Sequence, residues 1–213
     1  MNEIFKKLAL LGDVWVLWLL VGASVWSFGV MIERWRTFRK NSLDFGKFLE
    51  ELTQKLDHGD LTGARQAVRA SSGVEARVAL AGLSNFGKGP SAVEEAMTSR
   101  LVLERSQLEK NLIILGTLGN NAPFIGLFGT VLGIIKAFND LAVSGSSGAS
   151  VVMSGVSSAL IATAFGIFVA IPAVAANNYF FTRLKRISAN GQSLIHLMQV
   201  HMKQEVQSHA TGI

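Results

Sequence analysis

Three long stretches without a charged side chain constrain this sequence more than any other feature. No Asp, Glu, Lys or Arg occurs in residues 14–32, 111–135 or 141–182, which are 19, 25 and 42 residues long. An α-helix needs about 20 apolar residues to cross the hydrocarbon core of a bilayer. The sequence therefore predicts an all-α membrane protein whose three transmembrane helices lie at 14–32, 111–138 and 151–182.

The positions of Lys and Arg predict how these helices are oriented. Basic residues follow the first and third stretches, whereas the connection 139–150 has none; they are Arg34, Arg36, Arg39, Lys40, Arg183, Lys185 and Arg186. Because cytoplasmic loops carry the excess of Lys and Arg, we expect 139–150 to be a periplasmic loop. The N-terminus is then periplasmic, with 1–13 as a periplasmic or interfacial segment, and the C-terminus is cytoplasmic, in a bacterial inner membrane.

Residues 33–110 hold 24 of the 35 charged residues and are predicted to be a helical cytoplasmic region. Apolar spacing and turn residues predict helices at 45–56, 61–69 and 74–83, followed by a break at 87–90. Ser91 and Glu94 have the spacing of a capping box. Because no residue between them and Asn120 stops a helix, we expect the second membrane helix to begin inside the cytoplasm. The third is likewise expected to project there, with 183–213 as a C-terminal helix or tail.

The second and third membrane stretches carry small residues at packing intervals. These are Gly126, Gly129 and Gly133 in the second, and Ser158, Ala162, Gly166 and Ala170 in the third. Small residues repeated every fourth position let helix backbones approach closely in lipid. A three-helix monomer would leave several of these faces, and nearby Asn, Ser and Thr side chains, toward lipid. We therefore expect a homo-oligomer with a shared polar interior.

Several residues in these helices have a simpler interpretation, which the sequence leaves open. Thr130 and Thr163 could each donate a hydrogen bond to the carbonyl one turn back on its own helix. Pro123 and Pro172 are expected to kink their helices. Neither 111–135 nor 141–182 contains Asp, Glu, His, Lys or Arg, and hydroxyls do not bind a proton near neutral pH. If the protein conducts protons, a partner chain must bring the acid.

At this point the residues resemble a known family. Residues 122–135, APFIGLFGTVLGII, resemble the second-helix motif of the MotA/TolQ/ExbB proton-channel family. Residues 159–166, ALIATAFG, and 169–173, VAIPA, are similar to its third-helix motif, and Glu33-Arg34 after the first helix also fits.

The resemblance implies an ExbB/TolQ-like motor subunit that forms a pentamer around a dimer of a single-span ExbD/TolR-like partner. That partner's transmembrane Asp would carry the ion, so that proton motive force drives work in the periplasm. Thr130 and Thr163 match the family's pore threonines. Ser158, also assigned to the ion pathway, stands where ExbB and TolQ members usually have Glu, which leaves Na⁺ coupling open beside H⁺. The remaining matched residues would pack the pore helices: Pro123, Gly126, Gly129, Gly133, Ala162, Gly166 and Pro172.

The powered machine also stays open among TonB-type uptake, Tol-Pal-type envelope maintenance and gliding motility. A second hypothesis is a structural membrane scaffold whose cytoplasmic region recruits a soluble partner. We expect no enzyme, resident cofactor or metal site, because no nucleophile, acid–base pair or metal-ligand cluster stands out and the chain has no Cys. Nucleic acid is not an expected partner, because the basic residues flank membrane spans.

Overall fold

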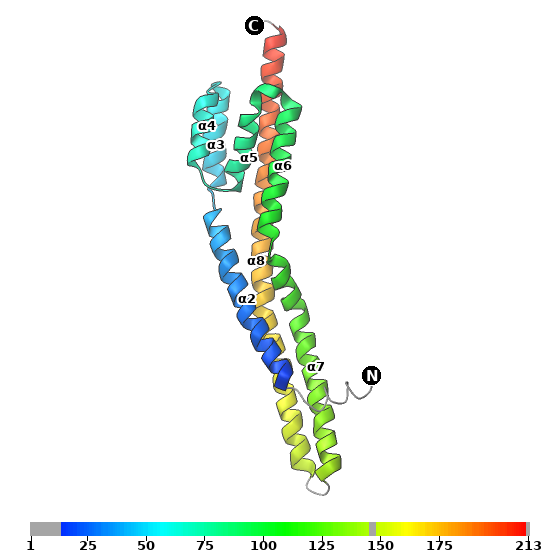
Figure 1. The fold of residues 1–213 in the computed structure, drawn as a ribbon. Coiled ribbons are helices and arrows are strands. Elements are labelled where there is room, and N and C mark those ends of the chain that lie inside the picture. Colours follow the sequence, from blue (N-terminus) through cyan, green and yellow to red (C-terminus); the bar gives the residue numbers. More distant parts are fainter. Residues whose placement is uncertain (1–13, 145–147, 212–213) are drawn as a thin grey trace. The chain divides into compact units, whose positions relative to one another are not determined.

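A computed structural model describes residues 14–144 and 148–211, and every regular element in them is helical (Figure 1). The elements are α2 (Val14–Lys40), α3 (Phe45–Asp57), α4 (Leu61–Ala70), α5 (Val74–Ser84), the 3₁₀ turn η1 (Phe86–Lys88), α6 (Pro90–Glu109), α7 (Leu112–Ser144) and α8 (Gly148–Thr211). The predicted segment 1–13 and part of the predicted loop lie outside the described residues. The helices form two compact units. We call residues 14–33 and 111–179 the membrane unit, and residues 34–110 and 180–211 the charged unit.

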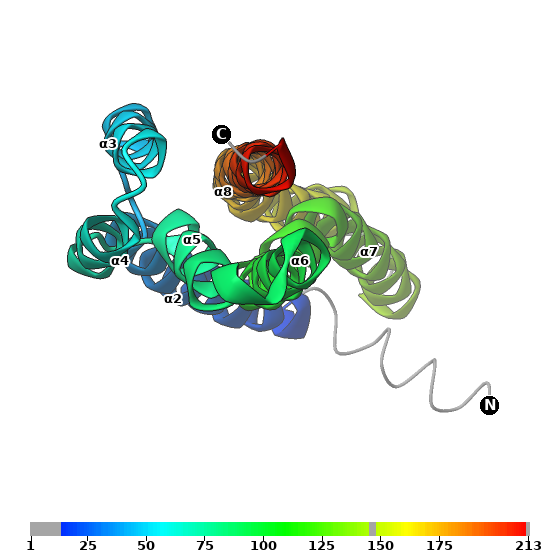
Figure 2. The ribbon, with the colours of Figure 1, turned by 90° about the horizontal axis from the view of Figure 1, so that it is seen from above.

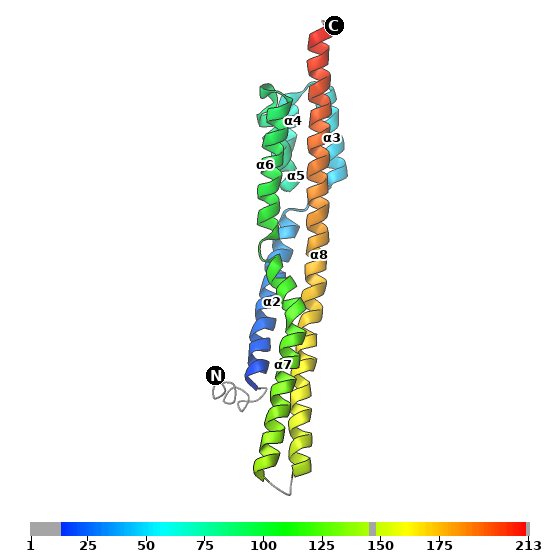
Figure 3. The same ribbon diagram turned by 90° about the vertical axis from the view of Figure 1, so that its right-hand side faces the viewer.

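The membrane unit contains the apolar parts of α2, α7 and α8. Three helices of the described chain are long and apolar enough to cross a membrane, as the sequence predicts. Their shared core joins Val16 and Leu20 of α2 to Ala122 and Leu132 of α7 and to Val169 and Ala170 of α8. Figure 3 shows α7 running beside the first part of α8. The first membrane helix therefore buries one face and exposes another, where Trp18 and Trp26 lie.

The charged unit is built from amphipathic helices. The helix α3 buries Phe48, Leu52 and Leu56, and α4 buries Ala64 and Val68. Both begin at an Asp whose carboxylate accepts a hydrogen bond from a backbone N–H of the first turn, Asp44 from Lys47 and Asp60 from Gly63. The helices α5 and α6 lie side by side (Figure 2), where Gly82 makes room for Met97. The three helices predicted before the break are thus confirmed, as is the extension of the third long helix.

The start of α6 differs from the sequence prediction. The helix begins at Pro90, its N-cap is Gly89, and no side chain caps it, so the capping box of Ser91 and Glu94 is wrong. Gly89 has φ +95°, a conformation that favours glycine. Pro90 is already set to a helical φ and has no N–H that needs a cap. The Gly-Pro pair therefore starts the helix in place of a capping side chain.

The helix that we expected to run unbroken from residue 91 into the membrane is in fact two helices. The helix α6 ends at Glu109, Lys110 is extended with ψ 136°, and Asn111 has φ +67°. Asn tolerates this left-handed conformation better than other residues with a side chain. The Asn111 side chain also donates a hydrogen bond of 3.3 Å to Glu33. Lys110 and Asn111 therefore end one helix, and α7 begins at Leu112.

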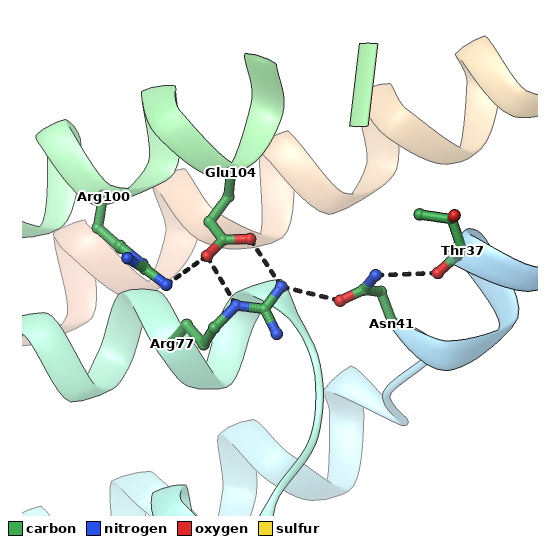
Figure 4. Close-up of polar contacts among 5 residues, drawn as sticks. All are labelled: Thr37, Asn41, Arg77, Arg100 and Glu104. Carbon is green, nitrogen blue, oxygen red and sulfur yellow. Dashed lines mark hydrogen bonds and ion pairs between the residues drawn. The ribbon is translucent and has the colours of Figure 1, made fainter. Parts of the chain in front are cut away.

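A buried carboxylate links α5 to α6 in the charged unit (Figure 4). Arg77 donates two hydrogen bonds to Glu104, at 2.7 and 2.6 Å, and a third to Asn41 at 2.8 Å. Arg100 lies 2.6 Å from the same carboxylate. Burial acts to raise the pKa of Glu104, but hydrogen bonds and charge from Arg77 and Arg100 outweigh it and hold that pKa below its ordinary value. Glu104 is therefore charged in the folded protein.

Replacing this carboxylate should destabilise the charged unit in a pH-dependent way. A carboxyl group whose pKa is lowered by folding stabilises the protein fully above its unfolded pKa, and this contribution disappears as the pH falls through the folded value. We expect Glu104→Gln to cost about 1–3 kcal/mol at neutral pH, below the roughly 3–5 kcal/mol of fully buried pairs because both arginines are part-exposed. Thermal unfolding in detergent between pH 7 and pH 3 measures the effect, which should shrink toward the acid end.

Glu95→Gln is the matched control, because Glu95 is exposed on the same helix. Identical unfolding curves for the two variants across the pH range would contradict the assigned role of Glu104.

Candidate functional site

The structure brings Thr130 of α7 and Thr163 of α8 together inside the membrane unit. Their hydroxyl groups are hydrogen-bonded to each other. Thr130 also lies 3.1 Å from the carbonyl oxygen of Gly126, to which it donates. Because a hydroxyl has one proton, Thr163 must then donate to Thr130. The oxygen of Thr163, which is only half-buried, keeps acceptor capacity for another donor.

Glycines explain why these two side chains can meet. A Cβ at Gly126 would lie 2.6 Å from the carbonyl oxygen of Ala162 and 3.0 Å from the Cα of Thr163. A Cβ at Gly166 would lie 2.6 Å from the carbonyl oxygen of Ala122. The backbones of α7 and α8 therefore touch directly, closer than any side chain would allow. This is the small-residue packing that helices use in lipid.

The other predicted residues lie on or near the same interface, with one exception. Gly129 faces Ala162, from which an added Cβ would be 2.9 Å, and Gly133 is buried on α7. Pro123 and Pro172 lie inside α7 and α8, respectively, and both are half-buried. Ser158, in contrast, lies on an exposed face of α8.

The simpler interpretation, a hydrogen bond to the carbonyl one turn back on the same helix, is confirmed for Thr130. It does not describe the whole arrangement. Its hydroxyl bonds the carbonyl one turn back, as a Thr in a membrane helix often does. The same oxygen also bonds Thr163 across the interface, so the intrahelical bond fixes where the Thr130 oxygen points. What results is a short hydroxyl chain from the Gly126 carbonyl through Thr130 to Thr163.

Two polar groups of α2 were not singled out from the sequence. The indole nitrogen of Trp15 and the hydroxyl of Ser27 are buried and form no hydrogen bond with the described part of the chain. The Trp15 ring packs edge-on against Phe128, with centroids 6.2 Å apart. Tryptophan near the end of a membrane helix is ordinarily taken as an interfacial anchor. The usual anchor interpretation therefore does not predict that the indole nitrogen of this half-buried Trp is buried.

The basic residue of the Glu33-Arg34 pair has a structural role in the charged unit. Arg34 is buried, and its guanidinium donates to the carbonyl oxygens of Leu108 at 3.2 Å and Gln107 at 3.4 Å. A cation at these last carbonyls of α6 also interacts favourably with the helix dipole. Among the described residues, no group of three or more His, Cys, Asp and Glu side chains could hold a metal ion.

Comparison with known proteins identifies the family. The family model for the MotA/TolQ/ExbB proton channel family matches residues 70–193, more than half of the chain. The chain belongs to this family. It is 38% identical to the Tol-Pal system protein TolQ of Pseudomonas aeruginosa over 178 residues, which cover 77% of this chain and 76% of that one. It is 32% identical to the TolQ of Haemophilus influenzae over 211 residues, covering 87% and 86%.

Matches to ExbB proteins of this family are shorter. The biopolymer transport protein ExbB of Xanthomonas campestris pv. campestris is 43% identical over 88 residues, 41% of this chain and 35% of that one. The family model and the three apolar helices together define a multi-pass inner-membrane protein and an ExbB/TolQ-like proton-channel motor subunit. The predicted family is therefore confirmed.

A side chain at position 166 should separate the two helices. We expect Gly166→Val to lower the thermal midpoint by several degrees or to prevent folding, because its Cβ would collide with the α7 backbone. Since the chain has no Cys, the loss of contact can be followed in a T130C/T163C background. Mild oxidation should join these positions within one chain, and Gly166→Val should abolish that cross-link.

Gly29→Val is the control, because no atom lies within 4 Å of the Cβ it would add. A full cross-linking yield with Gly166→Val, or cross-links formed only between chains, would contradict the direct helix contact.

Proposed function

We propose that this chain is the ion-conducting ring subunit of an inner-membrane motor, working with a single-span partner that carries a transmembrane Asp. The observation that carries the proposal is the Thr130–Thr163 hydroxyl pair, set in the stretches 111–135 and 141–182, which contain no Asp, Glu, His, Lys or Arg. The family resemblance implies a pentamer around an ExbD/TolR-like dimer. The N-terminus would face the periplasm and the C-terminus the cytoplasm, as the basic residues predict.

The hydroxyl pair suits a wall along which a protonated acid passes. Thr163 keeps acceptor capacity after it donates to Thr130, so a carboxylic acid O–H of the partner can donate to it. An ionised carboxylate would instead need a donor, and the Thr163 proton can turn toward it because Thr130 keeps its bond to the Gly126 carbonyl. The pair can therefore bind both states of the partner's acid without itself ionising.

The membrane potential supplies enough free energy to move the partner's acid from one hydroxyl pair to the next. Moving one elementary charge across the membrane potential releases about 2.3 kcal/mol per 100 mV. A hydrogen bond between membrane helices contributes about 0.6 kcal/mol on average and up to about 1.7 kcal/mol. The transfer of one ion therefore releases enough free energy for the partner's acid to break its hydrogen bond with one subunit and form one with the next.

We take the proton as the transported ion and Tol-Pal-type envelope maintenance as the output. Support for the output comes from the TolQ relatives, whose matches extend over about three quarters or more of both chains. Ser158 is exposed and stands where the family pattern has Glu. Because hydroxyl oxygens can coordinate Na⁺, Na⁺ is the alternative ion that the experiment must test.

Removing the Thr163 hydroxyl should stop ion flow and leave the fold intact. The experiment co-expresses the chain with the small single-span protein encoded beside it and measures pH changes in proteoliposomes under an imposed potential. We expect flux only with both proteins, a drop of at least tenfold for Thr163→Val, and activity near wild type for Thr163→Ser. Repeating the assay with and without a Na⁺ gradient separates the two ions.

Thr117→Val serves as the control, because Thr117 is exposed on α7 and its hydroxyl lies outside the pair. Size-exclusion chromatography confirms that each variant still assembles. Unchanged activity in a T130A/T163A variant would favour the structural scaffold over the motor, and flux through the chain without its partner would refute the proposed source of the acid.

A further inference from the structure

A polar cavity lies within the charged unit, between the end of α2, the start of α5 and α8. Its polar lining comes from Asn41, Ser42, Glu75, Arg183, Arg186 and Asn190. Its volume is about 80 Å³, which is smaller than the roughly 300–1,000 Å³ of drug-sized sites and suits a small polar group. The hydroxyl pair and the helix contact described above make no use of this cavity.

Glu75 gives the cavity a hydrogen-bond acceptor that the described residues do not satisfy. Its side chain is buried, with 2% of the residue exposed. One carboxylate oxygen accepts a hydrogen bond of 2.9 Å from Asn190, whereas the other accepts none from the part of the chain that the structure describes. Leaving a buried carboxylate oxygen unpaired is costly, so such a group usually has a partner.

A second acceptor oxygen lies near the first, beside Gly73. A Cβ built on Gly73 would lie 3.5 Å from the unpaired Oε2 of Glu75 and 3.6 Å from the backbone carbonyl oxygen of Asn41. Arg77, two residues along α5, is already engaged by Glu104 and Asn41 (Figure 4). Two acceptor oxygens near each other favour a donor with several N–H groups and a positive charge, which describes a primary ammonium.

Two arginines supply positive charge on another wall of the cavity. Arg183 and Arg186 are three residues apart, so they lie on the same face of α8. Among the described residues, neither has a hydrogen bond or an ion pair. Guanidinium groups bind phosphate oxygens in pairs of hydrogen bonds. Arg183 and Arg186 also come just after the uncharged stretch 141–182. Lipid phosphates lie at the ends of membrane helices, so such a position is suited to binding them.

We propose that this cavity binds a group that carries both a primary ammonium and a phosphate, as the headgroup of an ethanolamine phospholipid does. The ammonium lies against Glu75 and the Asn41 carbonyl, and the phosphate lies against Arg183 and Arg186. A purely anionic headgroup would satisfy the arginines but would give Oε2 of Glu75 no donor. A simpler alternative is that both arginines only mark the membrane boundary. It predicts no preference of the protein for one lipid headgroup over another.

Thermal unfolding of the assembled protein in detergent, titrated with short-chain phospholipids, tests the proposal. Dihexanoyl phosphatidylethanolamine should raise the midpoint at concentrations at least tenfold lower than the phosphatidylcholine or phosphatidylglycerol analogues. R183Q/R186Q should weaken this binding at least tenfold. Glu75→Gln should remove the preference for ethanolamine over choline and keep the phosphate interaction. Lys185→Gln is the control, because Lys185 lies on the same turn but outside the cavity lining.

Stepwise N-methylation of the ethanolamine lipid tests the same contact in the wild-type protein, in case Glu75→Gln does not fold. Affinity should fall with each methyl group that replaces an N–H. Soluble phosphoethanolamine separates the two sources of this chemistry: equal binding would support a soluble ligand, and weaker binding a lipid. Equal binding of all headgroups, stronger binding of phosphatidylglycerol, or an equal effect of inorganic phosphate would overturn the proposal.

Discussion

The direct contact between the α7 and α8 backbones is the constraint on which the membrane unit depends. At Gly126 and Gly166 each helix presents backbone where other helices present side chains, and an added Cβ would lie 2.6 Å from a carbonyl oxygen of the other helix. Lipid tails are as apolar as Leu or Val, so burying such side chains gains little in a membrane. Close packing and hydrogen bonds must hold the helices together instead, and both require that the glycines stay side-chain free.

The two units solve the problem of buried polarity in different ways. In the membrane unit, Thr130 and Thr163 at the contact of α7 and α8 carry neutral hydroxyls, which pair with each other and with a carbonyl at little desolvation cost. In the charged unit a buried carboxylate is acceptable because two guanidinium groups neutralise it. A carboxylate at the position of Thr163 would need a comparable counter-ion in lipid. This difference explains why we assign the titrating group of the motor to another chain.

Much of the architecture could be predicted from the sequence, because charge and apolar spacing act locally. The uncharged stretches predict the three membrane helices, and the apolar spacing after Phe45 predicts α3 closely. The predictions were wrong where the backbone conformation of one or two residues decides where a helix begins or ends. Ser91 and Glu94 have the spacing of a capping box, but Gly89 and Pro90 start the helix before them. Asn is among the residues that can end a helix, but the sequence pattern did not single out Asn111, whose positive φ ends the run.

The sequence by itself determined the membrane class, the number of apolar helices, the small-residue faces and the absence of Asp, Glu and His from the predicted membrane helices. These follow from composition and from the spacing of residues along the chain, which do not depend on tertiary contacts. Only the tertiary structure decided that Thr130 and Thr163 bond each other and that Ser158 stays outside their interface. It also decided that one oxygen of Glu75 has no partner in residues 14–144 and 148–211. Such facts depend on distances between residues far apart in the chain, and those distances are set by how closely the packed backbones approach.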